Sequence, residues 1–129
     1  MHTSQKPSKR ILLIDDDIKF SVGIVALLKR EGYAVSSSRS GVEGLEMIKT
    51  QKPNLILCDM MMPPPDGLML KKEINGDKEL GAIPFLFISA KTSQKDIDSA
   101  LAIGAAGYVL KPFVVSDLIE KINGILHPL

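Results

Sequence analysis

Residues 11 to 17 read ILLIDDD, which is four large apolar residues followed at once by Asp15, Asp16 and Asp17. A short apolar run that is β-branched at both ends is typical of a strand buried on both faces of a parallel sheet. The predicted strand therefore ends where the three carboxylates begin. Because open parallel sheets bind ligands beyond the carboxyl ends of their strands, these acids are the first candidates for a functional site.

The alternation of strand and helix continues outward from this segment. Ile18, Val22, Val25 and Leu28 are spaced as on one face of a helix, and Gly32 supplies its stop signal. Further strands are predicted at residues 33–38, 55–58, 85–89 and 108–111, and further helices are marked by apolar residues around 42–48, 68–74, 97–101 and 118–125. Five strands alternating with five helices predict a doubly wound α/β fold, in which a five-stranded parallel sheet is covered on both faces.

Composition limits the class of protein. The chain has 129 residues, of which 45% are hydrophobic and 24% charged, as expected for one globular domain. Its net charge of +1 gives no general attraction to nucleic acid or to membrane surfaces, so direct nucleic acid binding is not expected. No apolar run approaches the roughly 20 residues that span a bilayer, and the basic start is followed by only four apolar residues, so neither membrane insertion nor secretion is predicted.

The chain has one cysteine, Cys58, and its two histidines, His2 and His127, lie near the ends. An internal disulfide and a zinc site built from cysteine and histidine are therefore not expected, which favours a reducing, cytoplasmic location. Cys58 is predicted to be an inert buried thiol.

Five polar residues end the predicted strands and should meet at one edge of the sheet: Asp15, Asp16, Asp59, Ser89 and Lys111. Crowded carboxylates repel one another unless a hard cation lies among them, and Mg²⁺ prefers such oxygen ligands. The lysine would balance the remaining charge. The common phosphate-binding loops, GxxxxGK[ST] and GxGxxG, do not follow the first strand, which disfavours nucleotide binding in those modes.

Four segments occur in order at the predicted strand ends, namely ILLIDDD, LILCDMMMPPPDG, FLFISA and GAAGYVLKPF. Together they resemble the receiver domain of two-component response regulators, over about residues 9 to 126. The resemblance implies a flavodoxin-like (βα)5 fold with strand order 2-1-3-4-5. A receiver domain is expected over residues 9–129, after a flexible polar tail over residues 1–8.

The resemblance also implies the phosphoacceptor and the metal ligands. In this family, the aspartate that ends the third strand accepts a phosphoryl group from the phosphohistidine of a sensor histidine kinase or a histidine phosphotransfer protein, and here it is Asp59. Asp16 would bind Mg²⁺ directly, Asp15 would bind it largely through water, and Asp59 itself would be a further ligand. The backbone carbonyl of Met61 would complete the protein ligands.

The remaining matched residues imply how the signal is passed on. Ser89 would hydrogen-bond the phosphoryl oxygen, Lys111 would pair with it, and Tyr108 would be the aromatic residue that rotates inward on switching. The Lys111-Pro112 peptide bond would be cis. The predicted function is a phosphorylation-activated switch whose face of fourth helix, fifth strand and fifth helix regulates a downstream protein target or output domain. We expect a monomer or a weak phosphorylation-dependent dimer, with no catalysis beyond its own phosphotransfer and slow autodephosphorylation.

Simpler readings compete for some of these residues. Asp17 could be a further metal ligand, but an acid just before a helix is more simply its N-cap. Tyr108 alone would be read as a half-buried strand aromatic. Residues 60–62, three consecutive methionines, are predicted to pack rather than to bind a soft metal, because no cysteine or histidine accompanies them as a ligand.

Two departures from the family pattern and two rival functions remain. Three prolines at residues 63–65 predict a stiff loop before Asp66, and Ala105 and Ala106 stand where many DNA-binding relatives carry acids for a dimer salt bridge. A phosphohydrolase of the haloacid dehalogenase type would need a second aspartate two residues after Asp59, where Met61 stands. A degenerate receiver that only docks unphosphorylated would lack an acid or the lysine, and none is missing.

Overall fold

The structure is a computed structural model and describes residues 8–90 and 93–128. The tail predicted over residues 1–8 lies outside the described residues except for Ser8, which is exposed. Within the described part of the chain, no helix has the length and the apolar character needed to cross a membrane.

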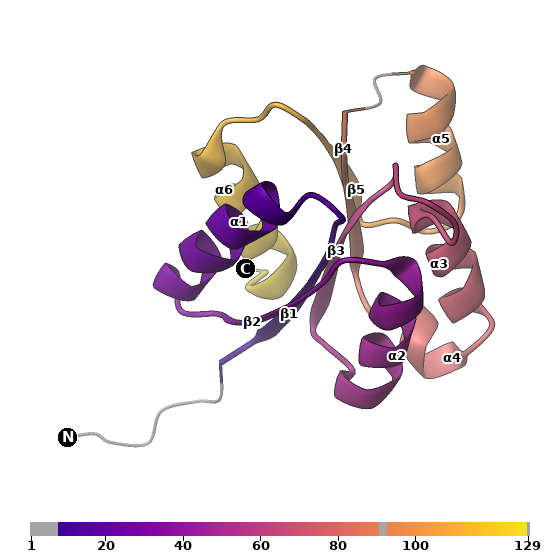
Figure 1. The fold of residues 1–129 in the computed structure, drawn as a ribbon, viewed down its shortest axis with the longest axis horizontal. Coiled ribbons are helices and arrows are strands. Elements are labelled where there is room, and N and C mark those ends of the chain that lie inside the picture. The colour runs from indigo at the N-terminus through magenta and orange to yellow at the C-terminus, as the bar shows by residue number, and fades with distance from the viewer. Residues whose placement is uncertain (1–7, 91–92, 129) are drawn as a thin grey trace.

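Five parallel strands form one sheet in the order β2-β1-β3-β4-β5 (Figure 1). The strands are β1 (Arg10–Ile14), β2 (Ala34–Ser38), β3 (Leu55–Asp59), β4 (Phe85–Ser89) and β5 (Gly107–Leu110). The helices are α1 (Ile18–Arg30), α2 (Gly41–Gln51), α3 (Gly67–Asn75), α4 (Lys78–Gly81), α5 (Gln94–Ala102) and α6 (Val115–Leu126). The predicted flavodoxin-like fold and its strand order are confirmed.

The short helix α4 was not predicted, since no helix was expected between the one around residues 68–74 and the strand at residues 85–89. Asp77 begins this helix, because its carboxylate accepts hydrogen bonds from the backbone N–H groups of Glu79 and Leu80. Leu80 is buried in the core, so one turn of helix covers apolar surface before β4 begins. The described residues therefore form six helices rather than five.

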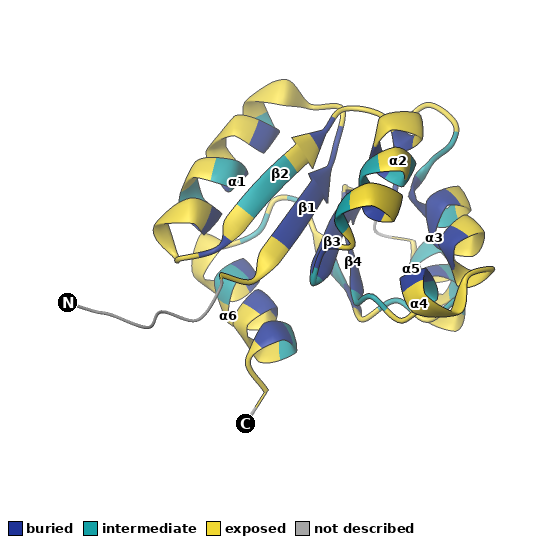
Figure 2. Ribbon diagram, turned by 90° about the horizontal axis from the view of Figure 1, so that it is seen from below, coloured by how far each residue is buried: buried dark blue, intermediate teal, exposed yellow. Residues whose placement is uncertain are grey.

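The sheet separates two apolar cores (Figures 1 and 2). Alternate residues of a strand point to opposite faces, so Ile11 and Leu13 of β1 face α1 and α6, while Leu12 and Ile14 face α2 and α3. Figure 2 shows that β1 and β3 are buried almost throughout, whereas the helices are exposed on their outer sides. Burial on both faces explains why these strands read as continuous apolar runs.

The predicted inner face of α1 is wrong in part. Ile18 and Val22 are 52% and 64% exposed, whereas Ile24 and Leu28 are buried against the sheet. Apolar residues occupy two adjacent stripes of this helix, and their spacing alone does not determine which stripe faces the sheet. For the same reason, two other residues used to mark helices are exposed, namely Val42 and Leu101.

Candidate functional site

The strand register brings the predicted residues to one edge of the sheet. Ile14 of β1 is paired with Cys58 of β3, so the next residues along the two strands, Asp15 and Asp59, lie side by side. On the other side of β3, β4 ends at Ser89, which is paired with Leu110 of β5, the residue just before Lys111. Acids at the ends of β1 and β3, the buried hydroxyl at the end of β4 and the lysine after β5 therefore converge, as predicted from the sequence.

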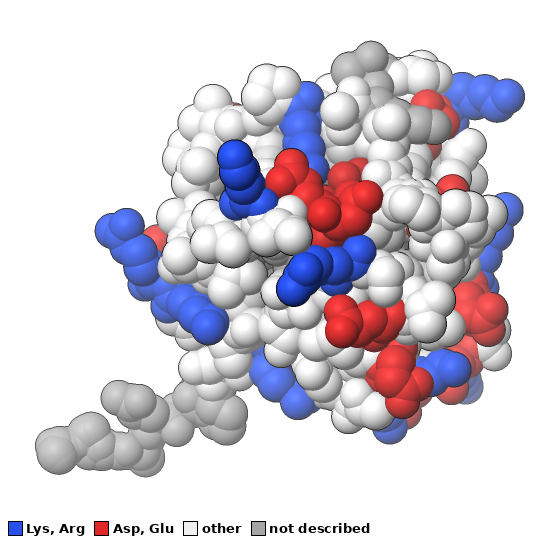
Figure 3. All heavy atoms as spheres, viewed as in Figure 1, with Lys and Arg blue, Asp and Glu red and all other residues white. Residues whose placement is uncertain are grey.

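Three carboxylates form the centre of the site. Asp15, Asp16 and Asp59 each offer an oxygen atom, and these atoms lie within 4.8 Å of one another. Asp15 and Asp59 are buried, while Asp16 is exposed. Figure 3 shows acidic side chains gathered at the middle of this face, with basic side chains beside them. The first two acids come from the turn between β1 and α1, and the third ends β3.

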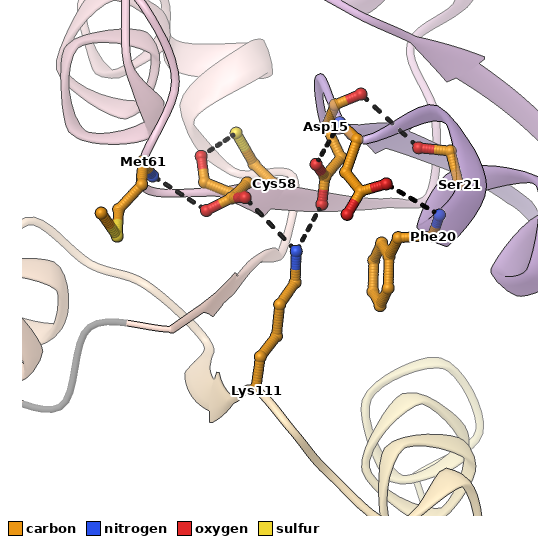
Figure 4. Close-up of polar contacts among 8 residues, drawn as sticks. Asp15, Phe20, Ser21, Cys58, Met61 and Lys111 are labelled. Carbon is orange, nitrogen blue, oxygen red and sulfur yellow. Dashed lines mark hydrogen bonds and ion pairs between the residues drawn. The ribbon is translucent and has the colours of Figure 1, made fainter.

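Lys111 is the cation of the site. Its Nζ lies 2.9 Å from Oδ2 of Asp15 and 3.4 Å from Oδ2 of Asp59, and its side chain is 20% exposed. Figure 4 shows the side chain extending from the end of β5 toward Asp15. Burial by itself would lower the pKa of Lys111, but the hydrogen bond to Asp15 and the charges of Asp15 and Asp59 outweigh burial and raise it. Lys111 is therefore held in its charged form.

For Asp15, in contrast to Lys111, burial has a larger effect on the pKa than the neighbouring charge and hydrogen bonds. Burial raises the pKa of this carboxyl, although the backbone N–H of Asp17, 2.9 Å from Asp15 Oδ1, and the ammonium of Lys111 both act to lower it. The lysine therefore does not fully compensate the cost of burying this carboxylate. A further cation beside Asp15 would reduce that cost.

The donor set fits a hard divalent cation. When all four groups are ionised, three carboxylates and one ammonium leave an excess of negative charge that a divalent ion would offset. Within the described part of the chain, the Asp16 carboxylate makes no hydrogen bond or ion pair, so it is available as a ligand. Asp15, Asp16 and Asp59 could therefore hold a metal such as Mg²⁺.

Asp59 is oriented from both sides of its carboxylate. Its Oδ1 accepts a hydrogen bond from the backbone N–H of Met61 at 2.8 Å, and its Oδ2 faces Lys111. Gly67, at the start of α3, lies directly behind it, because a Cβ atom there would come within 2.7 Å of the Asp59 carbonyl oxygen. The loop after β3 can approach this closely only with glycine at that position. The backbone carbonyl of Met61 remains a predicted ligand.

The N-cap interpretation of Asp17 is confirmed. Its carboxylate accepts a hydrogen bond from the backbone N–H of Phe20 at 3.1 Å, and it therefore begins α1. The Lys111-Pro112 peptide bond is cis, as the family resemblance implied, and so is the bond between Pro64 and Pro65 in the proline-rich loop.

Ser89 and Tyr108 are connected in this structure. Ser89 is fully buried, and the Tyr108 ring is half-buried, with its centroid 6.2 Å from that of Phe87. The Tyr108 hydroxyl lies 3.7 Å from the sulfur of Met60. Burial raises the pKa of Tyr108, and a hydrogen bond with the Ser89 side chain opposes that rise. The Tyr108 hydroxyl is therefore already linked to Ser89, the residue predicted to hydrogen-bond the phosphoryl oxygen.

One contact of the site was not predicted. The ring of Phe20, in the first turn of α1, lies with its centroid 4.0 Å from Nζ of Lys111. The only sequence signal for it is an aromatic residue three positions after the helix cap, which has no specific meaning by itself. Cys58, in contrast, is fully buried, as predicted. Burial, followed by the charge of Asp59, raises the pKa of its thiol well above the usual value.

Comparison with known proteins gives consistent results. A family model for the response regulator receiver domain matches residues 11–123. Over 120 residues, the chain is 33% identical to Response regulator MprA of Mycobacterium tuberculosis and to Alkaline phosphatase synthesis transcriptional regulatory protein PhoP of Bacillus subtilis. These matches cover 93% of this chain but 51% and 49% of the two proteins. The chain thus spans about half the length of the curated relatives it matches.

Solved structures support the same assignment. A CheY-like response regulator receiver domain protein from Methanospirillum hungatei is similar with a TM-score of 0.86 and 30% identity, over 93% of this chain and 94% of that one. Chemotaxis protein CheY4 of Vibrio cholerae has a TM-score of 0.87 and 25% identity, over 93% of this chain and all of that one. Since the family model matches residues 11–123, which is most of the chain, the chain belongs to the family of response regulator receiver domains.

Proposed function

We propose that the chain is a phosphorylation-activated switch of a two-component phosphorelay. Asp59 accepts a phosphoryl group from the phosphohistidine of a sensor histidine kinase or a histidine phosphotransfer protein, in a reaction that depends on Mg²⁺. One observation carries this proposal: the Asp59 carboxylate is held by the Met61 N–H at 2.8 Å and faces Lys111 at 3.4 Å, beside two further carboxylates.

The proposed reaction forms one bond and breaks one. An Asp59 carboxylate oxygen attacks phosphorus, the phosphorus–nitrogen bond of the donor breaks, and the imidazole leaves with the electron pair of that bond. Bound Mg²⁺ would neutralise charge on the phosphoryl oxygens. Lys111 would move its hydrogen bond from Asp59 to a phosphoryl oxygen. Its Nζ already lies 3.4 Å from Oδ2 of Asp59, the residue that would carry the phosphoryl group. Asp15 keeps the ammonium in place through the second ion pair.

The geometry also bears on the two rival functions. Met61 stands where a phosphohydrolase of the haloacid dehalogenase type would carry its second acid, and its N–H is used to hold Asp59. In a domain that only docks, the acids and the lysine would not need to be in contact, whereas here they are. Both observations favour the phosphoacceptor function.

The output surface is proposed to be the face formed by α5, β5 and α6. Tyr108 lies in β5, and its hydroxyl is linked to Ser89 at the site, so the ring connects the phosphoryl position to this face. Leu101 and Leu110 are 49% and 39% exposed there and could contact a partner. The partner would be a downstream protein target or an output domain. The chain itself would act in the cytoplasm, as a monomer or a weak phosphorylation-dependent dimer without direct nucleic acid contacts.

Acetyl phosphate provides the direct test. With Mg²⁺ present, intact mass spectrometry should show one added phosphoryl group on the parent and none on Asp59→Asn, because an amide cannot form the acyl phosphate. Asp66→Asn is the matched control, since Asp66 lies in the same loop and caps α3, and asparagine caps a helix as well as aspartate does. Labelling of Asp59→Asn at the parent level would overturn the acceptor assignment.

A further inference from the structure

The Lys111 ammonium has a third contact besides the two carboxylates. The Phe20 ring lies with its centroid 4.0 Å from Nζ, with the cation over the ring face (Figure 4). The face of an aromatic ring carries partial negative charge, and a cation within about 6 Å of its centroid is attracted to it. Asp15, Asp59 and Phe20 therefore surround one ammonium group with two full charges and one weak, uncharged acceptor.

The position of the ring is fixed from two directions. Phe20 lies in the first turn of α1, where its backbone N–H donates to the Asp17 cap at 3.1 Å. Its ring also packs edge to face on Phe113, with centroids 5.9 Å apart and ring planes at 85°. Because Phe113 follows Lys111 by two residues, the same segment supplies both the cation and the support for the ring.

From this geometry we propose that Phe20 is a positioning residue for phosphoryl transfer, which holds the Lys111 ammonium beside Asp59 through a cation–π contact. The inference rests on the proposed function of Asp59. A carboxylate alone would hold the ammonium by a strong pair that must be loosened when the cation turns toward the phosphoryl group. The face of the Phe20 ring limits where the ammonium can move. It accepts no full hydrogen bond, so it does not compete with the phosphoryl group for the ammonium.

The contact predicts an electrostatic signature that packing alone would not produce. Phe20→Leu removes the ring, and Phe20→Tyr keeps it. Replacing Phe20 with pentafluorophenylalanine keeps the shape of the ring and reverses the charge distribution of its face. We expect the phosphorylation rate with acetyl phosphate and Mg²⁺ to fall by about three- to tenfold in the leucine and pentafluoro variants, and to stay close to the parent in the tyrosine variant.

A second measurement is independent of phosphorylation. In the parent without phosphodonor, the Lys111 side-chain methylene protons next to Nζ should show an upfield ring-current shift in the NMR spectrum, because they lie near the ring face. The shift should persist in Phe20→Tyr and disappear in Phe20→Leu. Circular dichroism and thermal unfolding would establish that all three variants are folded.

The outcomes separate the two proposals. If the parent accepts no phosphate while the ring-current shift is present, the function proposed for Asp59 fails and the contact stands. If the parent is phosphorylated and the pentafluoro variant reacts as fast as the parent, Phe20 only packs and the positioning role is overturned. Absence of the ring-current shift from the parent would also overturn it.

Discussion

Replacing Asp16 should make the metal-free protein more stable and the magnesium-loaded protein less stable than the parent. Its carboxylate lies within 4.8 Å of two others and is exposed. Two unit charges at 4.8 Å repel by about 1 kcal/mol in water-like surroundings and by about 3.5 kcal/mol at an effective dielectric constant of 20. Exposure places Asp16 near the lower value, and Lys111 offsets part of the repulsion.

We therefore expect Asp16→Asn to raise the free energy of unfolding without metal by about 0.5–1 kcal/mol, or roughly 2–5 °C in melting temperature for a chain of this length. With Mg²⁺ at about 100 times its dissociation constant, the parent should gain about 2.7 kcal/mol. The variant should lose most of that gain, because the ligand proposed to bind the metal directly is absent. The order of stability of the two proteins then inverts on adding Mg²⁺.

Thermal unfolding in chelator and in Mg²⁺, with a calorimetric titration of Mg²⁺, measures both effects. Asp17→Asn is the matched control: it removes the same charge from the next residue and leaves asparagine, which also caps a helix. It should keep the Mg²⁺ response of the parent. An unchanged response in Asp16→Asn, or a lost response in Asp17→Asn, refutes the assignment of Asp16 as the direct ligand. A less stable metal-free Asp16→Asn refutes the repulsion argument.

Three further predictions concern the packing and the signal. Gly67→Ala should lower the free energy of unfolding, measured by chemical unfolding, by about 1–3 kcal/mol, since the added Cβ would lie 2.7 Å from a backbone oxygen. Gly23→Ala, whose added Cβ would have nothing within 4 Å, should raise it by about 0.5–1 kcal/mol. Equal effects of the two substitutions would contradict the close approach at Gly67. Because burial raises the pKa of the Cys58 thiol, the folded protein should resist alkylation at mildly alkaline pH and react only when unfolded; fast reaction of the native protein would disprove this. Ser89→Ala and Tyr108→Ala should still accept phosphate but show smaller chemical-shift changes along α5 and α6 when beryllofluoride is added; a parent-like response of Tyr108→Ala would reduce that ring to a packing residue.

The fold class and the edge of the sheet that carries the site could be predicted from the amino-acid sequence. Strands buried on both faces must be apolar throughout, so the first polar residue marks the end of each strand. Parallel strands end at the same edge, and the residues after Ile14, Cys58 and Ile88 were therefore predicted to meet there without any knowledge of contacts. The cap of α1 was equally local, because a helix start needs an acceptor within three residues.

Other features depend on how distant segments of the chain pack together, and no local pattern predicts them. The spacing of apolar residues in α1 did not determine which stripe faces the sheet, because the rotation of a helix is set by the surface on which it packs. Lys111 and Asp15 lie 96 residues apart, and their ion pair depends on the register of three strand pairs. The ring of Phe20 reaches the same ammonium only because α1 and the segment after β5 pack side by side, and no spacing within either segment records that contact.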